Sequence, residues 1–547
     1  MTNHQPLIIG IDAGTSVIKA VAFSLKGEQI LVASVRNTYH TTKEGAATQS
    51  LQQTWLDCAQ AIADLGKQLS NFRERVVALA VTAQGDGTWL IDADGQPVTD
   101  AWLWLDGRAA PTVAQLQSLD GERSRFEATG TGLNTCQQGA QLAHMVRHYP
   151  ELLDQAATAF HCKDWLYFNL TGIKATDPSE ASFTFGDFRT RQYKDEVIAQ
   201  LGLNDYRYLL PPIIDGSETT HPLSQSAAEL IGLKAGIPVS LAYVDMVMTA
   251  LGAGVHTQDD SVSCSVIGST GVHMRSVADQ EVYLNDAGTG YVIVLPVPGK
   301  VTQVQTNMAS ALNLDWLLNV ASELLAEFGI DADNKALIAK IEGWLNQSEP
   351  GQLIYHPYIS DAGERGPFVD ANARASFTGV TYRHRYPDLV RAVIEGIGMA
   401  MRDCYEGMGG AATELRLSGG AARSAQLRAI LAACVGADVR VSLREEAGAA
   451  GAAMMAAVAN GYYPDMNTCI AEWVTPLLGQ SEAVDPNLTR IYDNLYQAYL
   501  EQRQSYPHVW QTLAKQRDFA CAANGQNSTH NKNDASGRAP DFCANNQ

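Results

Sequence analysis

The sequence predicts a protein of two α/β lobes, and three observations lead to this expectation. Its 547 residues exceed what one hydrophobic core normally serves. Apolar strand patterns alternate with helical patterns, as is typical of α/β domains. A strand, a glycine turn with hydroxyl residues and a second strand occur near the N-terminus and again near residue 268, so the two lobes are expected to share a design. We expect the first lobe to span residues 1–256 and the second to span residues 257–515.

The first lobe is predicted to begin with an antiparallel meander. Leu7–Asp12, Val17–Phe23 and Gln29–Val35 are apolar β-runs joined by glycine turns. Leu51–Leu69 has the apolar spacing of a helix, and Val76–Thr82 is typical of a short buried strand.

The second lobe is predicted to start in the same way at Ser261–Gly271. Helical patterns follow at Ala309–Phe328 and Leu389–Met408, and Leu415–Val435 has the pattern of a strand, a turn and a helix. Residues 516–547 are rich in Asn, Ser, Gly, Ala and Gln with little periodicity, so we expect a disordered tail outside the fold.

Charge and composition narrow the class of protein. The net charge is −20, from 39 basic and 59 acidic residues, and no basic run offsets it, so neither nucleic acid nor an anionic membrane is expected as a partner. The nine cysteines are scattered without a CxxC pair, which argues against a disulfide framework and a thiolate zinc site. With no secretory signal visible, we expect a cytoplasmic protein.

The first glycine turn, Asp12-Ala-Gly14-Thr15-Ser16, follows an apolar strand. Gly14 lets the backbone approach a phosphate, and the amides and hydroxyls of the turn can donate to its oxygens. Asp12 could hold Mg²⁺ directly or through water, since that ion prefers oxygen ligands. The alternative is a plain hairpin with a capping aspartate.

Two further glycine turns fit the same ligand. Together with the first turn, the one near residue 268 predicts two phosphate loops facing each other across a cleft, and no GxxxxGK[ST] P-loop or HRD/DFG set is present. A third turn, near residue 419, offers small residues against which adenine and ribose could lie. The nearby helical run Gly448–Ala457 is better explained by tight helix–sheet packing. The candidate residues of the two turns are Gly268, Ser269, Thr270, Gly419, Gly420 and Ala421.

Over residues 6–510 the chain resembles the FGGY carbohydrate kinases, a family that includes glycerol kinase, xylulokinase, ribulokinase and erythritol kinase. Many ordered motifs carry the resemblance, which makes a chance likeness very improbable. Besides the three turns they are Trp104-Leu-Asp106-Gly-Arg108, Lys163-Asp164-Trp165, Leu170-Thr171-Gly172, Thr176-Asp177-Pro-Ser179, Tyr243-Val-Asp245 leading to Gly252, Gly363-Glu-Arg-Gly-Pro367 and Arg391-Ala-Val-Ile-Glu395-Gly396.

The resemblance implies a two-lobed actin/hexokinase/Hsp70-like (ribonuclease H-like) fold with ATP and Mg²⁺ in the cleft between the lobes. It implies that Asp12 and Thr15 belong to the first phosphate site and that Asp245 is the catalytic base. A carboxylate within hydrogen-bond reach can take the proton of a hydroxyl that attacks phosphorus. It also makes a homodimer a candidate assembly, because related kinases are often dimers.

Asp245 has a structural alternative, because it interrupts the apolar segment Val239–Leu251 and a buried aspartate can be a helix cap or a paired group. A non-catalytic nucleotide-binding protein on the same fold is the alternative of a different class. Such a protein needs no carboxylate at this position.

The acceptor segment is expected to be Gln84-Gly85-Asp86, where glycerol kinases have Gln-Arg-Glu and xylulokinases Gln-Met-His. A carboxylate accepts hydrogen bonds from hydroxyls, which suits a polyol, and Gly85 is expected to leave room for a longer carbon chain. Cys136 stands where glycerol kinases are expected to have a substrate-facing tyrosine, and Met246 stands where they have glutamine. Both differences argue against glycerol as the substrate.

The combination most resembles the erythritol kinase branch, so the sequence predicts phosphorylation of a terminal hydroxyl of a four-carbon polyol. A pentulose kinase (xylulose or ribulose type) and a glycerol kinase are the alternatives. Asp106 either contacts substrate or pairs with Arg108. Glu364 and Arg365 are expected to form a structural acid–base pair.

Overall fold

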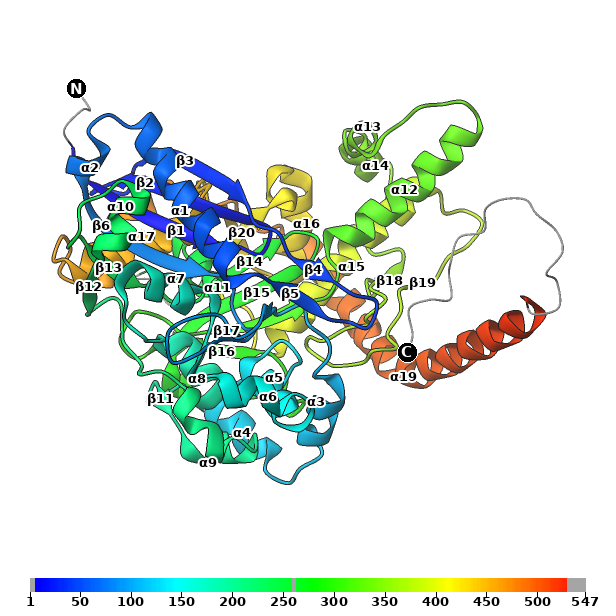
Figure 1. The fold of residues 1–547 in the computed structure, drawn as a ribbon. Helices are drawn as coiled ribbons and strands as arrows, with labels where there is room; N and C mark the ends of the chain where they lie inside the picture. The colour runs from blue at the N-terminus through cyan, green and yellow to red at the C-terminus, as the bar shows by residue number, and fades with distance from the viewer. Residues whose placement is uncertain (1–4, 258–261, 529–547) are drawn as a thin grey trace.

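The computed structural model describes residues 5–257 and 262–528, and two six-stranded sheets form its centre (Figure 1). The strand order is β12-β13-β6-β1-β2-β3 in the first sheet and β16-β17-β15-β14-β20-β21 in the second. Both sheets are mixed, with an antiparallel meander on one side and parallel strands on the other, and β12 adds an antiparallel edge to the first sheet.

In the first sheet, β1 pairs antiparallel with β2, and β2 with β3, while β6 runs parallel to β1 and to β13. β1 is apolar and buried on both faces, as a central strand covered by helices requires. The strands are β1 (Leu7–Ala13), β2 (Val17–Ser24), β3 (Gln29–Arg36), β6 (Val76–Ala83), β12 (Thr220–Pro222) and β13 (Pro238–Leu241).

The second sheet repeats this plan. β14 pairs antiparallel with β15, which pairs with β17, while β20 runs parallel to β14 and to β21. The predicted repetition between the lobes is therefore confirmed, and the fold is the two-lobed ribonuclease H-like fold. Ser261 of the predicted turn lies outside the described residues. The strands are β14 (Val262–Ile267), β15 (Gly271–Ala278), β16 (Tyr291–Val294), β17 (Lys300–Asn307), β20 (Glu414–Gly419) and β21 (Asp438–Val441).

Two small-residue helices, α11 (Asp245–Ala253) and α17 (Ala447–Ala459), join the lobes. A methyl group on Gly252 would lie 2.1 Å from the Ala447 carbonyl oxygen, and one on Gly451 would lie 2.2 Å from that of Met248. The predicted tight packing of this helical run is thus confirmed, against α11 as well as against the sheet. One hydrophobic core contains residues of both helices and of both sheets.

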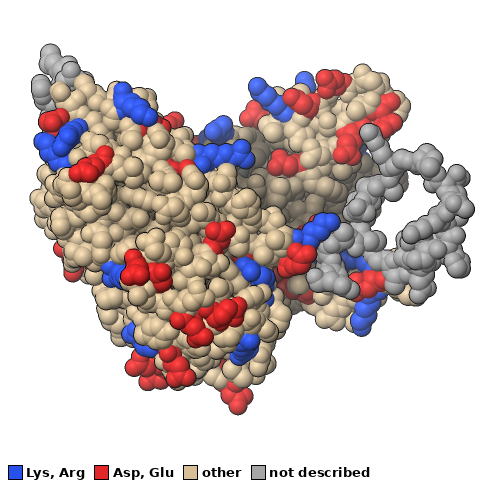
Figure 2. Space-filling view, in the orientation of Figure 1, with Lys and Arg blue, Asp and Glu red and all other residues tan. Residues whose placement is uncertain are grey.

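The remaining helices surround this centre (Figure 1). One group of helices comes from the chain segment between β6 and β12. Helices α12 to α14 project as an extension, and a hollow separates this extension from the main body (Figure 2). The helices used below are α1 (Leu51–Gln68), α7 (Cys162–Thr171), α8 (Pro178–Phe185), α12 (Ala311–Glu327), α13 (Asn334–Ile338), α14 (Ile341–Leu345), α15 (Tyr386–Glu406) and α16 (Ala425–Val435).

The predicted start of a disordered tail at residue 516 needs correction. Helix α19 runs from Pro486 to Ser528, so the segment is helical as far as Ser528. Buried Tyr499 and Trp510 anchor the helix to the body, and the Leu, Ala, Lys, Gln and Arg residues that follow favour its continuation. Residues 529–547 lie outside the described residues. No helix in the described ranges combines the length and apolarity that a bilayer crossing requires.

Candidate active site

The first glycine turn connects β1 to β2, with the Gly14 N–H donating to the Val17 carbonyl at 3.0 Å. Asp12 lies just before this turn. Burial raises the pKa of its carboxyl to about 6, although the charge of Lys19 opposes the shift. A methyl group on Gly448 would lie 2.3 Å from Asp12 Oδ2 and 3.0 Å from Thr249 Oγ1, so Asp12 contacts α17 beside α11.

Asp245 is the first residue of α11, and its Oδ1 accepts the N–H of Met246 at 2.6 Å. Burial and then the negative charge of Asp12 raise its pKa well above the ordinary value, with smaller contributions from Glu180 and Asp86. The structure therefore brings the predicted base together with the first phosphate turn and the acceptor segment.

Gln84 follows β6 and is buried. Its Oε1 accepts a hydrogen bond from the Thr15 hydroxyl at 2.8 Å, and its Nε2 donates to Gln49 at 2.7 Å. The Thr15 hydroxyl also accepts from the indole N–H of Trp104 at 2.9 Å. The phosphate turn and the acceptor segment thus share one hydrogen-bonded chain.

Asp86 adopts a left-handed backbone with φ of 58°, held by its N–H donating to Glu180 Oε1 at 3.2 Å. Its Oδ1 is buried and accepts no hydrogen bond within the described residues. Burial raises the pKa of Asp86, while the Cys136 thiol and the charges of His161 and Arg365 oppose that shift. A buried, unpartnered carboxylate oxygen fits a ligand hydroxyl.

The expected role of Gly85 is wrong. A methyl group there would lie 2.4 Å from Val244 Cγ2 and 3.2 Å from Glu180 Oε1. The missing side chain allows α8 and the segment before Asp245 to approach the backbone, and it does not leave space for a longer substrate.

The contacts of the Arg365 side chain differ from the predicted pair with Glu364. The Glu364 carboxylate accepts the N–H groups of Met308 and of Arg365 itself, both at 2.9 Å. The Arg365 side chain extends away to donate to Thr306 Oγ1 at 3.1 Å, where its charge acts on Asp86. A positive charge from the second lobe therefore acts on Asp86.

Asp106 is fully buried and engaged within the protein. Its oxygens accept hydrogen bonds from the Ala47 N–H at 2.9 Å and from the Arg108 guanidinium at 2.6 and 3.0 Å. Of the two alternatives, pairing with Arg108 describes the contacts that the structure gives it.

The second glycine turn lies between β14 and β15, and Ser269 and Thr270 in it are exposed. The carbonyls of Gly268 and Ser269 accept the N–H groups of Ala311 and Ser310 at 2.9 and 2.8 Å, which fixes the turn against the start of α12. Ser16 of the first turn is exposed as well.

Gly419 ends β20 with φ of 90°, and a methyl group there would lie 2.4 Å from the Ile267 carbonyl oxygen. Gly420 and Ala421 follow in the short 3₁₀ segment Gly420–Arg423. A largely apolar cavity of about 580 Å³ opens beside this turn. It is lined by residues that include Ile267, Ala311, Leu314, Ile341, Gly420 and Leu427.

These features fit ATP and magnesium. The cavity has the size and apolar lining of a ligand site, and exposed hydroxyls of both turns are available to phosphate. The described residues contain no cluster of three or more His, Cys, Asp or Glu side chains arranged to hold a metal ion. Asp12 as a single ligand matches Mg²⁺, which keeps several waters and takes phosphate oxygens.

Comparison with known proteins decides the family. Residues 7–252 match the N-terminal domain, and residues 264–460 the C-terminal domain, of the FGGY family of carbohydrate kinases. The chain belongs to the FGGY family of carbohydrate kinases. The predicted resemblance is confirmed, and the protein is a kinase that uses ATP and acts on a small sugar-like substrate.

Relatives of this FGGY kinase span its length. Erythritol kinase of Brucella abortus (strain 2308) is 62% identical over 514 residues, which covers 94% of this chain and 99% of the relative. Xylulose kinase of Escherichia coli (strain K12) is 29% identical, covering 93% and 99%. The crystal structure of gluconate kinase from Lactobacillus acidophilus superposes with a TM-score of 0.84 at 20% identity, covering 93% and 100%.

Sequence reasoning missed several residues that the structure brings close to the predicted acceptor segment. Arg365 was assigned a structural pair, and Glu180 and His161 were not singled out, although both are buried next to Asp86. Lys163, Asp164 and Asp177 belong to the family motifs, but the sequence alone predicts no contact or role for them. A usable signal was present, because charged residues inside the apolar runs around residues 162–170 and 177–185 indicate buried, paired groups.

Proposed function

We propose that this kinase phosphorylates a terminal hydroxyl of a four-carbon polyol, erythritol, with ATP as donor and Asp245 as the base. The observation that supports the substrate most strongly is the 62% identity with the Brucella abortus erythritol kinase over nearly the whole chain. The unpartnered oxygen of Asp86 adds an acceptor for the hydrogen bonds that a polyol donates. Erythritol phosphate and ADP are the products.

In the proposed mechanism, the carboxylate of Asp245 accepts the hydroxyl proton while the substrate oxygen bonds to the γ-phosphorus and the bond to ADP breaks. Burial makes Asp245 a stronger proton acceptor once it is ionised. Asp86 and Gln84 orient the polyol, and exposed hydroxyls of both glycine turns donate to phosphate. Magnesium near Asp12 would supply positive charge that balances the phosphate oxygens. We further propose that the lobes, divided near residue 256, close over the substrates to exclude water.

A substrate panel tests the proposal. ADP release would be measured with glycerol, erythritol, the pentitols and the pentuloses at equal concentration. We expect the highest kcat/KM with erythritol, and faster turnover on a pentulose would overturn the assignment in favour of the xylulose or ribulose type. Highest kcat/KM with glycerol would overturn it in favour of a glycerol kinase.

A further inference from the structure

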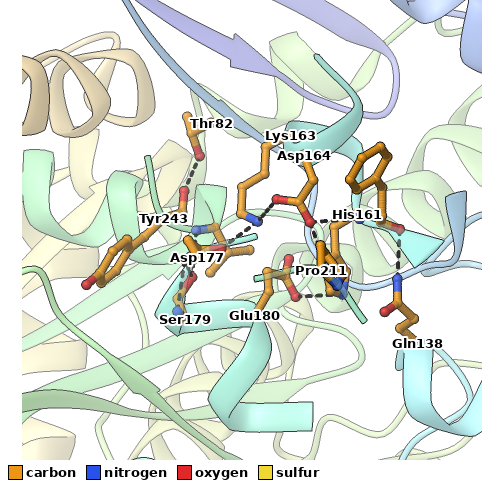
Figure 3. A network of polar contacts seen from close by, with 12 residues as sticks. Thr82, Gln138, His161, Lys163, Asp164, Asp177, Ser179, Glu180, Pro211 and Tyr243 are labelled. Atoms are coloured by element: carbon orange, nitrogen blue, oxygen red, sulfur yellow. Dashed lines mark hydrogen bonds and ion pairs between the residues drawn. The ribbon is translucent and has the colours of Figure 1, made fainter. Parts of the chain in front are cut away.

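A lysine without solvent exposure lies at the centre of a polar network in the first lobe (Figure 3). Lys163 Nζ, on α7, lies 2.8 Å from Asp164 Oδ1 and 2.5 Å from Asp177 Oδ2. Burial raises the pKa of Asp164, but Lys163 and His161 more than reverse this and lower it to about 2, so the pair is held as charges. A buried charge cluster is costly to form and resists displacement, because each member depends on the others.

One branch of the network leads to the segment before the base. Asp177 Oδ1 caps α8 by accepting the Ser179 N–H at 2.8 Å, and it also accepts the Ser179 hydroxyl hydrogen. The Ser179 Oγ in turn accepts the N–H of Val244 at 3.0 Å. Val244 immediately precedes Asp245, so a continuous chain of contacts connects Lys163 to the backbone that carries the base.

The second branch leads to the acceptor segment. Asp164 Oδ2 lies 3.2 Å from His161 Nδ1, and His161 Nε2 lies 3.4 Å from Glu180 Oε2. The other oxygen of Glu180 accepts the N–H of Asp86 at 3.2 Å. Burial would lower the pKa of His161, but the carboxylates of Glu180 and Asp164 raise it, which favours a positive charge between them.

The two branches also meet on the backbone, because Ser179 and Glu180 are neighbours on α8. Gly85, next to Asp86, lies against both Val244 and Glu180 so closely that a methyl group would collide. The ends of the two branches are therefore in contact, and neither loop can shift without disturbing the other.

We propose that Lys163 and its two branches are a positioning network that sets the base Asp245 and the polyol ligand Asp86 at a fixed separation. The proposal rests on the proposed roles of these two residues. The Ser179 branch aligns the base with the reacting hydroxyl, so it governs kcat. The Glu180 branch holds Asp86 in its left-handed conformation, so it governs the KM for the polyol.

Variants of the branches test this better than a variant of Lys163, whose loss would leave Asp164 and Asp177 buried without their cation and would endanger folding. Ser179→Ala keeps the cap of α8, which uses the Ser179 backbone N–H, and removes the hydroxyl that accepts the Val244 N–H and donates to Asp177 Oδ1. We expect kcat to fall by at least ~10-fold with the KM for ATP nearly unchanged, since small misplacements of a base are costly. Ser263→Ala is the matched control, because the buried Ser263 Oγ likewise accepts one backbone N–H, that of Ala412 at 2.9 Å, in the second lobe.

Glu180→Gln tests the other branch, with Glu395→Gln as its control. Glu395 is also buried and also accepts a backbone N–H at 3.2 Å, from Gly351, but it lies on α15. We expect Glu180→Gln to raise the KM for erythritol about 5-fold or more while kcat falls less than in Ser179→Ala.

The outcomes separate the two proposals when Asp245→Asn is assayed alongside. If Asp245→Asn retains turnover, the base assignment fails and the network proposal fails with it. If Asp245→Asn is inactive but Ser179→Ala loses no more kcat than Ser263→Ala at equal melting temperature, the network proposal alone is overturned. It is also overturned if Glu180→Gln leaves the KM for erythritol equal to that of Glu395→Gln.

Discussion

At the acceptor end of the cleft, Asp86, Glu180 and Asp245 have raised pKa values in buried surroundings, and a network centred on Lys163 lies beside them. At the nucleotide end, the glycine turns at 268 and 420 present backbone groups and hydroxyls beside an apolar cavity. The acceptor end thus depends mainly on buried charge, and the nucleotide end on backbone shape.

This difference between the acceptor end and the nucleotide end predicts which kind of substitution should affect each. A buried charge is sensitive to single-atom substitutions, because the energy of an ionised group depends on each neighbour. A backbone turn is sensitive to added volume and to φ, and tolerates changes of charge around it. Isosteric substitutions should therefore affect the acceptor end, and a single methyl group should affect the nucleotide end.

The largest expected effect is at Asp245. Asp245→Asn removes the proton acceptor with almost no change in volume, and we expect kcat to fall by about 10³-fold while ATP affinity is kept. ADP release measured with ATP binding by calorimetry checks both parts. Turnover near that of the unmodified kinase would remove Asp245 as the base and favour a role as a helix-terminal structural group.

Asp86 should show the next largest effect. Asp86→Asn replaces one carboxylate oxygen by an amide donor, so we expect the KM for erythritol to rise about 10-fold with the KM for ATP unchanged. Asp106→Asn is the contrast, since Asp106 is engaged by Arg108 and the Ala47 N–H. It should lower the melting temperature and leave the KM for erythritol unchanged. A raised KM without loss of stability would instead make Asp106 a substrate ligand.

The sequence could predict those features of the fold and site that depend on local patterns. The strand periods predicted β1, β2, β3 and β6 to within one residue at either end, because apolar alternation and glycine turns act locally. The turns at Gly14 and Gly268 were found for the same reason. Asp245 was found through its motif, and the structure adds the neighbours that perturb it.

What could not be predicted depends on contacts between distant segments. Gly85 was expected to leave space, but Val244 fills it from a strand–helix junction far along the chain. Arg365 comes from the other lobe, and no local pattern indicates that its side chain turns away from Glu364 towards Thr306. Pairwise tertiary packing determines both cases, and a single sequence does not reveal it.

The pH dependence of kcat/KM should show a smaller effect. Asp12 from β1, Glu180 from α8 and Asp86 from the acceptor loop all face Asp245 with negative charge and raise its pKa beyond the effect of burial. Activity should therefore fall as the pH drops through a pKa above the ordinary aspartate value of about 4.

Glu180→Gln removes one of these charges and so lowers the pKa of Asp245. The acidic limb of the kcat/KM profile should then move to lower pH, by about half a unit. Profiles of the unmodified kinase, Glu180→Gln and Glu395→Gln check this. A limb that moves equally in both variants would show that the charge of Glu180 does not act on the base.

The smallest expected effect is at the nucleotide end, where Gly419 and Gly420 are adjacent but differ in backbone conformation and in the space around them. Among the described residues, a methyl group on Gly420 would meet no atom within 4 Å, whereas one on Gly419 would meet the Ile267 carbonyl at 2.4 Å in a left-handed backbone. Gly420→Ala should keep the melting temperature and raise the KM for ATP about 3-fold by narrowing the approach to the cavity, with the KM for erythritol unchanged. Gly419→Ala should lower the melting temperature, because both the collision and the φ of 90° disfavour it. A change in the KM for erythritol in Gly420→Ala would show that the two ends are not independent, and that the turn at Gly420 also affects acceptor recognition.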